Sequence, residues 1–246
     1  DSMTANPGAY IGTPTYGQPG ADRPVSPVGL SVGFSGDDWV SVPSSGSLEL
    51  TGDMSWELWL RPDDLSVRRN PLAKAYSGEG AITQEMSGRL SFYQGDGGGN
   101  TSGYEWLLSS PLTPGVWSHV VLVRSGTSLT WYVNGVADTS KTAVRTPVAS
   151  SLPLLIGDGY KSGYVGGIDE VAVYNTALTS TQISDHYLML ASGDHVGYGE
   201  MVEADGPVSY WRLDDTAGPT AVDSMTANPG AYIGTPTYGQ PGATIN

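Results

Sequence analysis

The chain has 246 residues, with 11 Lys and Arg against 25 Asp and Glu, and its formal net charge is −14. This acidity argues against partners that need basic patches, namely nucleic acids and anionic membrane surfaces. Cysteine is absent, which excludes disulfides, cysteine–zinc sites and a cysteine nucleophile. The sequence has no apolar stretch of about 18 residues, so it predicts no membrane insertion.

The middle of the chain reads as a series of short β-strands separated by turns, for which the 34 Gly and 17 Pro residues are well suited. Alternating or continuous apolar residues predict strands at residues 39–43, 54–60, 88–93, 105–108, 119–124, 128–133, 153–157 and 168–174. The run 95–100 is rich in glycine and predicts a loop. Asn134-Gly135 is the strongest hairpin signal in the chain.

The stretch 54–60 alternates most regularly. One face of the predicted strand carries Met54, Trp56, Leu58 and Leu60. Trp59 lies on the opposite face, together with Ser55 and Glu57. Two interpretations follow for Trp59: a second buried face of a sandwich, which is the more common case, or an exposed platform for a ligand.

One short helix is predicted near residues 179–191. Thr179 at the N-cap and Gln182 three residues later fit a capping box, apolar residues follow at helical spacing, and Gly193 ends the pattern. Residues 192–207 read as a linker, and residues 208–213 as a further strand.

Residues 1–21, DSMTANPGAYIGTPTYGQPGA, recur without a change as residues 223–243. Identical stretches at a fixed offset indicate a repeating module, so we expect the chain to be a window cut from a tandem array. Tandem copies favour reach and multivalency over a single catalytic centre.

Several motifs occur in an order that resembles the laminin-G-like, concanavalin-A-like lectin/glucanase superfamily. They are FSGDDWV at 34–40, SWELWLRP at 55–62, WSHV at 117–120, LTWYVNG at 129–135, GIDEVAVYNTAL at 167–178 and PVSYWRL at 207–213. The string ADGPVSYWRLDD also resembles module junctions of phage minor tail proteins. The resemblance implies an all-β, two-sheet antiparallel jelly-roll sandwich in which the first and last strands pair closely.

The resemblance divides the chain into residues 1–191, a module without its own first strand, the linker 192–207, and residues 208–246, the opening of the next module. Residues 208–213 then have two arrangements open to them. They fold back onto the same module, so that 1–21 and 223–243 compete for one place, or they pair within the next module or a neighbouring molecule.

The sequence favours a chain that is not an enzyme. Glycanases of this fold carry paired acids as E-x-D-x-x-E or E-x-D-x-E, and neither string occurs here. Glycoside hydrolysis needs two carboxylates on opposite sides of one bond. The three histidines lack metal-ligand spacing, and no G-x-S-x-G elbow supports a serine nucleophile.

The resemblance implies a structural calcium ion where the opening loop meets the last strand. Asp169 with Asp223 and Asn228, or with their first-copy equivalents Asp1 and Asn6, supplies hard oxygen donors. Asp158 is a second candidate. The alternative is that Asp169 caps a strand and Asp223 caps a turn.

Aromatic residues beside loops rich in Gly and Ser are natural groups for sugar stacking, and the candidates are Tyr104, Trp106, Tyr160 and Tyr164. We therefore expect a non-catalytic adhesion module that binds cell-surface glycan, gains avidity by repetition, and is located outside the cell, on a phage tail or bacterial surface. The alternative is a structural spacer or filament subunit, linked to neighbouring copies head-to-tail by strand exchange, that binds no ligand.

Overall fold

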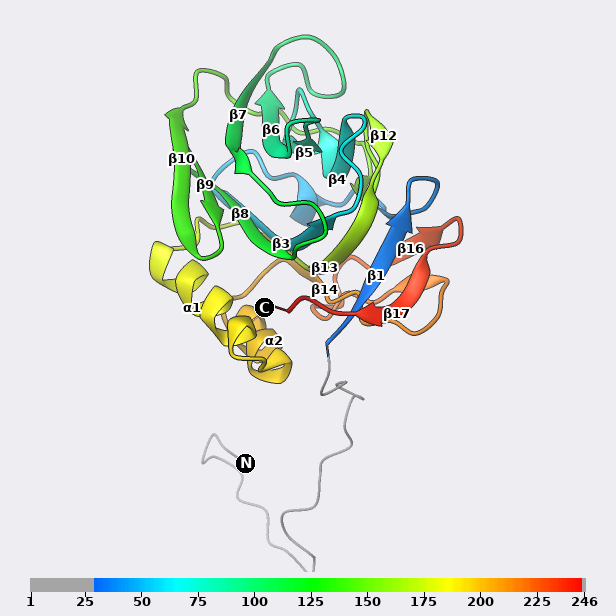
Figure 1. The fold of residues 1–246 in the computed structure, drawn as a ribbon. Coiled ribbons are helices and arrows are strands. Elements are labelled where there is room, and N and C mark those ends of the chain that lie inside the picture. Colours follow the sequence, from blue (N-terminus) through cyan, green and yellow to red (C-terminus); the bar gives the residue numbers. More distant parts are fainter. Residues whose placement is uncertain (1–28, 245–246) are drawn as a thin grey trace, which may run out of the picture.

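The computed structural model describes residues 29–244, which form two β-sheets packed face to face, with two helices beneath one of them (Figure 1). All strand pairs are antiparallel except the short pair between β12 and β4. The expected all-β, two-sheet jelly roll is confirmed.

The first sheet has the strand order β10-β9-β8-β3-β13-β1-β17, and β14 pairs with β13 beside β1. In chain order its strands are β1 (Leu30–Ser35), β3 (Met54–Pro62), β8 (Ser118–Ser125), β9 (Ser128–Val133), β10 (Val136–Thr142), β13 (Val165–Tyr174), β14 (Ser209–Trp211) and β17 (Thr237–Pro241).

The second sheet has the order β15-β16-β2-β11-β4-β5-β6-β7, and β12 pairs with β4. Its strands are β2 (Trp39–Val42), β4 (Arg69–Ala75), β5 (Gly80–Gln84), β6 (Arg89–Gly95), β7 (Tyr104–Pro111), β11 (Leu154–Ile156), β12 (Ser162–Gly163), β15 (Thr220–Ala221) and β16 (Gly230–Ile233). A single 3-10 turn covers Gly46–Leu48.

The main core lies between the two sheets. The alternation in β3 works as predicted, because its inward side chains are all buried in this core: Met54, Trp56, Leu58 and Leu60. The apolar surface that this core removes from water is the main stabilising contribution to such a sandwich.

A second buried cluster lies on the opposite face of the first sheet, under helices α1 (Ser180–Ala191) and α2 (His195–Ala204). The ring of Trp59 is fully buried there and stacks on Tyr187 of α1 with a centroid distance of 6.0 Å. The common interpretation of Trp59 as part of a second buried face is therefore correct.

The predicted helix is present as α1, and Thr179 and Gln182 form the complete capping box. Helix α2 was not predicted and occupies most of the expected linker 192–207. Its glycines, Gly197 and Gly199, are poor helix formers. The helix is instead stabilised by its N-cap Asp194, which accepts from the Gly197 N–H at 2.8 Å, and by buried contacts to the first sheet.

The segment after α2 returns to the sandwich of its own chain. Tyr210 of β14 pairs with Ala172 of β13, and the indole N–H of Trp211 donates to the Asn228 carbonyl at 3.0 Å. Strand β16 then pairs with β2 in the second sheet, and β17 with β1 in the first. Within the described residues, 208–213 thus pair with the sandwich of their own chain.

No helix within residues 29–244 is long and apolar enough to cross a membrane.

Candidate functional site

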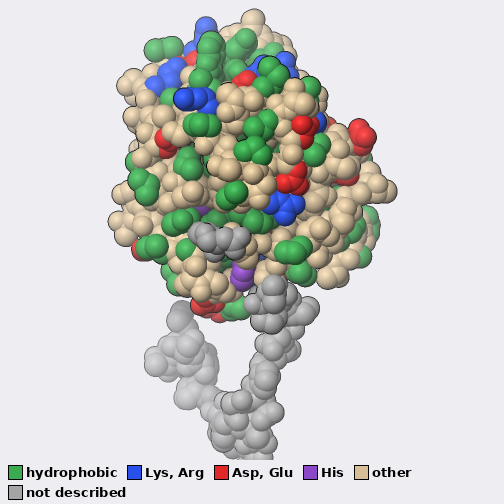
Figure 2. All heavy atoms as spheres, viewed as in Figure 1, with side chains coloured by type: hydrophobic (Ala, Val, Ile, Leu, Met, Phe, Trp, Pro, Cys, Tyr) green, Lys and Arg blue, Asp and Glu red, His purple; other side chains and the backbone are tan. Residues whose placement is uncertain are grey.

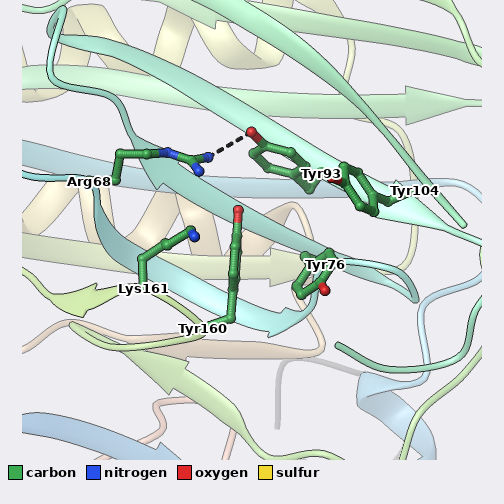
Figure 3. A pocket seen from close by; sticks show the side chains of 6 residues that line it. All are labelled: Arg68, Tyr76, Tyr93, Tyr104, Tyr160 and Lys161. Carbon is green, nitrogen blue, oxygen red and sulfur yellow. Dashed lines mark hydrogen bonds between the residues drawn. The ribbon is translucent and has the colours of Figure 1, made fainter. Parts of the chain in front are cut away.

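A pocket of about 130 Å³ opens on the second sheet, and aromatic and basic side chains line it (Figure 3). The lining residues are Arg68, Tyr76, Tyr93, Tyr104, Tyr160 and Lys161. Pockets that enclose a drug-sized ligand measure roughly 300–1,000 Å³, so this one suits a ligand that mostly lies on the surface and inserts a small part. Most of the visible Lys and Arg side chains lie in the upper half of the molecule, the end that carries β4 to β7 (Figure 2).

The pleat of two neighbouring strands places the rings on the outer face. In β6, Phe92 is buried in the core, so the adjacent Tyr93 points outward. In β7, Leu107 points inward and Trp106 outward. The register pairs Tyr93 with Trp106, which brings the two outward rings side by side at 6.1 Å between centroids.

The remaining rings come from segments that are distant in sequence. Tyr76 follows β4, and its ring lies 4.4 Å from Tyr160 and 5.2 Å from Tyr104, centroid to centroid. The Gly-rich loop after β6 positions Tyr76, because Asn100 accepts from its backbone N–H at 3.1 Å. The predicted loop at 95–100 thus helps to hold Tyr76 at the site without lining the pocket itself.

Two of the rings are open to solvent. Tyr104 is 41 % exposed and Trp106 51 % exposed, although large apolar rings usually find a buried position. Trp106 lies beside the pocket rather than in its lining, in contact with Tyr93 and Tyr104. Together the rings form a continuous aromatic surface of Tyr76, Tyr93, Tyr104, Trp106 and Tyr160, which we call the aromatic face.

Polar groups fix the rings in place and supply hydrogen-bonding groups at the pocket. Arg68 donates to the Tyr93 hydroxyl at 2.7 Å and forms a salt bridge with Glu85 at 2.8 Å. The Tyr160 hydroxyl shares a hydrogen bond of 2.8 Å with Thr83. The Lys161 ammonium is exposed and lies 5.4 Å from the centre of the Tyr160 ring.

Burial raises the pKa of both the Tyr160 and the Tyr93 phenol, so each stays protonated at neutral pH. Burial disfavours the Arg68 guanidinium charge, but Glu85 outweighs this and raises the Arg68 pKa. At neutral pH the pocket therefore combines phenol hydroxyls with two cations. Rings that stack on the flat face of a sugar, next to groups that bind its hydroxyls, suit carbohydrate recognition.

The structure brings three of the four predicted ligand residues together: Tyr104, Trp106 and Tyr160. It corrects the fourth, because Tyr164 is fully buried in the core between the sheets. Tyr164 follows the two-residue strand β12, and its side chain points inward there. A neighbouring loop rich in glycine is therefore not a reliable sign that the Tyr164 ring is exposed.

Sequence reasoning missed Arg68, Tyr76, Tyr93 and Lys161. One signal was present for Tyr93, because alternation from Leu90 and Phe92 places it on the outer face. Arg68 belongs to the only adjacent basic pair in the sequence, which marks it in so acidic a chain. Nothing in the local sequence indicates that Tyr76 lies next to Tyr160.

Two of the expected calcium ligands have their oxygens engaged by the protein itself. The Asp223 carboxylate accepts three backbone N–H bonds, from Tyr210, Met225 and Asn228. The side-chain amide oxygen of Asn228 accepts from the hydroxyls of Ser45 and Ser47. Asp223 therefore caps a turn, as the alternative interpretation expected, and this pair does not fit a calcium ligand set.

Asp169 accepts from the Ala243 N–H at 2.8 Å through Oδ2, and its buried Oδ1 has no partner in the described structure. Burial raises its pKa well above the usual range. Asp158 is partly buried in the loop before Tyr160, while Asp1 and Asn6 lie outside the described residues. Within residues 29–244, no three His, Cys, Asp or Glu side chains are grouped to hold a metal.

Calcium binding stays a prediction that a melting experiment tests. An ion bound only to the folded state stabilises it, so removing that ion with excess chelator lowers the melting temperature. Metal content measured before and after chelation serves as the control. An unchanged melting curve after verified metal removal would reject the ion.

Comparison with solved structures finds similar folds at low sequence identity. A candidate carbohydrate-binding protein from Bacteroides ovatus matches with a TM-score of 0.66 and 17 % identity, over 89 % of this chain and 62 % of that one. Domain 4 of AbnA, a GH43 extracellular arabinanase from Geobacillus stearothermophilus, was solved with arabinotriose. It matches with a TM-score of 0.51 and 20 % identity, over 63 % of this chain and 75 % of that one. The binding domain of botulinum neurotoxin serotype D matches with a TM-score of 0.51 and 15 % identity, over 64 % of this chain and 42 % of that one.

The chain thus spans 62 % of the length of the first of these structures, and at such identities the likeness shows the fold alone. A search of curated protein sequences gave no match. The family model described as the concanavalin A-like lectin/glucanases superfamily matches residues 34–184, which is more than half of the chain. The chain therefore belongs to the laminin-G-like branch of the concanavalin A-like lectin/glucanases superfamily.

Proposed function

We propose that this chain is a non-catalytic carbohydrate-binding module that recognises glycan through the aromatic face. The observation that carries the proposal is the cluster of Tyr and Trp rings on the outer surface of the second sheet, two of them strongly exposed, around a shallow pocket. Relatives in fold support it, since one is described as a candidate carbohydrate binder and another was solved with arabinotriose.

The composition of the pocket favours binding over hydrolysis. None of its six lining residues is a carboxylic acid, and the nearby Glu85 is held in a salt bridge by Arg68. A glycosidase needs two carboxylates that flank one bond. A pocket lined by aromatic rings, phenol hydroxyls and basic groups supplies no such pair.

The repeated segment suggests how a weak site works in its natural setting. A shallow pocket makes few contacts with each glycan, but linked modules convert later binding events into intramolecular ones, and avidity then exceeds the affinity of one module by about 10²–10⁴-fold. A tandem protein on a phage tail or a bacterial surface would use the module in this way, outside the cell and against cell-surface glycan.

The test is a glycan array probed with the chain in multivalent form, for example biotinylated and bound to streptavidin. We expect retention on a subset of bacterial wall or capsular glycans, and loss of that signal when Trp106 is replaced by alanine. Silence across wall and capsular glycans, with folded protein confirmed by circular dichroism, would argue for the spacer function instead.

The two cations at the pocket predict a preference for acidic sugars, which carry a carboxylate or a phosphate. The Arg68 charge is already paired with Glu85, so the exposed Lys161 is the group expected to discriminate. Exposed ion pairs contribute about 0.2–1 kcal/mol. We therefore expect Lys161→Met to weaken binding of an acidic glycan by up to about fivefold and to leave its neutral counterpart unaffected.

The measurement is a titration of both glycans at low and high salt, because salt screens exposed charges. The Lys161→Arg variant is the control and should restore binding of the acidic glycan. Equal loss for the acidic and neutral glycans would contradict a charge-based preference.

A further inference from the structure

One site on this sandwich accepts a segment that the chain contains twice. In the structure, residues 223–243 occupy it, with β16 paired to β2 and β17 paired to β1. Residues 1–21 have the same sequence in every position. Any contact between residues 223–243 and the rest of the sandwich is therefore chemically available to residues 1–21 as well.

The accepting surface is specific for this sequence. Tyr232 is 7 % exposed, and its hydroxyl donates to Asp215 at 2.8 Å. A side chain at Gly230 would place its Cβ 2.4 Å from Val40, so only glycine fits there. The first copy has Tyr10 and Gly8 at the corresponding positions and meets both requirements. Asp215 and Val40 lie outside the copies and belong to the acceptor.

The position where the segment ends makes the first copy a suitable occupant. The N–H of Gly242 donates to the carbonyl of Gly29 at 2.7 Å, so the end of the occupied site adjoins the start of β1. The first copy ends at Ala21, and residues 22–28 would connect it to Gly29. A chain of that length reaches about 25 Å when extended, and closing so short a loop costs little.

We propose that residues 1–21 exchange with residues 223–243 in this one site, within the same chain. Strand β14 and residues 214–222 keep their places in both states, because neither belongs to the repeated segment. The two states differ mainly in how each segment is tethered. This inference does not depend on glycan binding, since the site lies on β1 and β2 and not at the aromatic face.

Matched substitutions in the two copies test the exchange by a double-mutant cycle. Tyr232→Ala removes a buried ring from the second copy, and Tyr10→Ala makes the same change in the first. We expect Tyr10→Ala to be silent alone, and Tyr232→Ala to be mild because the first copy replaces the damaged one. The double variant has no intact segment, and we expect its melting temperature to fall by about 10 °C.

The signature is that Tyr10→Ala has an effect only in the Tyr232→Ala background. If Tyr232→Ala alone causes the full loss and Tyr10→Ala adds nothing to it, the first copy does not use the site and the proposal is overturned.

The absence of cysteine allows a second, direct measurement. Ser31 pairs with Gln240 in the structure, and Gln18 is the equivalent residue of the first copy. We expect Ser31→Cys to form a disulfide within one chain both with Gln240→Cys and, in a separate variant, with Gln18→Cys. The off-register pair of Ser31→Cys with Thr13→Cys is the control.

Peptide mass spectrometry and non-reducing gels read out the result. No Ser31→Cys/Gln18→Cys cross-link beyond that of the control would overturn the proposal. Cross-linked dimers in place of cross-linked monomers would also overturn exchange within the chain, and would favour strand exchange between neighbouring copies.

Discussion

Replacing Trp106 by alanine is expected to lower glycan affinity by about thirtyfold or more. Trp106 is the most exposed ring of the aromatic face, and aromatic hot-spot residues at binding sites contribute about 2 kcal/mol or more when truncated. The side chain points away from the core, so the fold should be preserved. Calorimetric titration with the strongest glycan from the array, together with a thermal melt, measures both effects.

Two further variants separate recognition from general damage. Tyr104→Ala should reduce affinity in the same way, because Tyr104 is exposed and in contact with Trp106. Val136→Ala removes an apolar side chain that is 68 % exposed on the edge strand β10, away from the aromatic face, and should leave affinity unchanged. Wild-type affinity in both aromatic variants would exclude the aromatic face as the binding site.

Tyr164→Phe tests the correction to the predicted site. The Tyr164 hydroxyl is buried without a hydrogen-bond partner in the described structure, and such a group costs free energy. Removing it should leave glycan affinity unchanged and should preserve or raise the melting temperature. Loss of affinity would mean that the core position of Tyr164 influences the pocket.

The sequence predicts the fold well where a pattern is local. Alternation in β3 assigns Trp56 to the core and Trp59 to the opposite face, and the pair Thr179 and Gln182 predicts the start of α1. These features depend on residues within one element, so residue propensity and periodicity are enough to predict them. Helix α2 has no such pattern and depends on packing against the first sheet.

The site is harder to predict because it is assembled from non-consecutive strands. Tyr76 and Tyr160 are in contact because the segment after β11 returns to β4: the Lys161 N–H donates to the Asn70 side chain at 2.7 Å, and β12 pairs with β4. No local pattern encodes that pairing. Exposure is similarly non-local, since Tyr160 and Tyr164 lie in one short loop region and yet face opposite sides of the sheet.

Replacing Glu57 by glutamine is expected to lower the free energy of unfolding by about 3–5 kcal/mol, because it leaves buried donors without their charged partner. Glu57 is fully buried on β3 beneath the helices. It accepts from His119 at 2.7 Å, from His186 at 3.0 Å, and from the hydroxyls of Tyr174 and Tyr198 at 3.1 and 3.2 Å. Chemical denaturation measures the loss, and Glu49→Gln, at an exposed position, is the control and should have little effect.

The same network predicts how stability depends on pH. Burial alone would raise the pKa of Glu57, but His186 and His119 hold it well below the usual value of 4.5. Burial lowers the His186 pKa, yet Glu57 and Asp205 outweigh this and raise it above 6.5. A histidine whose pKa is raised by folding stabilises the folded state below pH 6.5, and this stabilisation is lost as the pH rises through the pKa of the folded state. A lowered carboxylate pKa contributes stability above 4.5 that is lost in acid.

The pair therefore stabilises the fold most between about pH 4.5 and 6.5. We expect wild-type stability to decline as the pH rises above 6.5. Glu57→Gln should flatten that decline, because it removes the carboxylate that contributes most to raising the His186 pKa. His186 also lies 3.1 Å from Asp205 beyond the end of α2, so its neutralisation weakens the contact between α2 and the sheet. Denaturation midpoints measured from pH 5 to 9 decide this, and parallel profiles for the two proteins would show that His186 is not the titrating group.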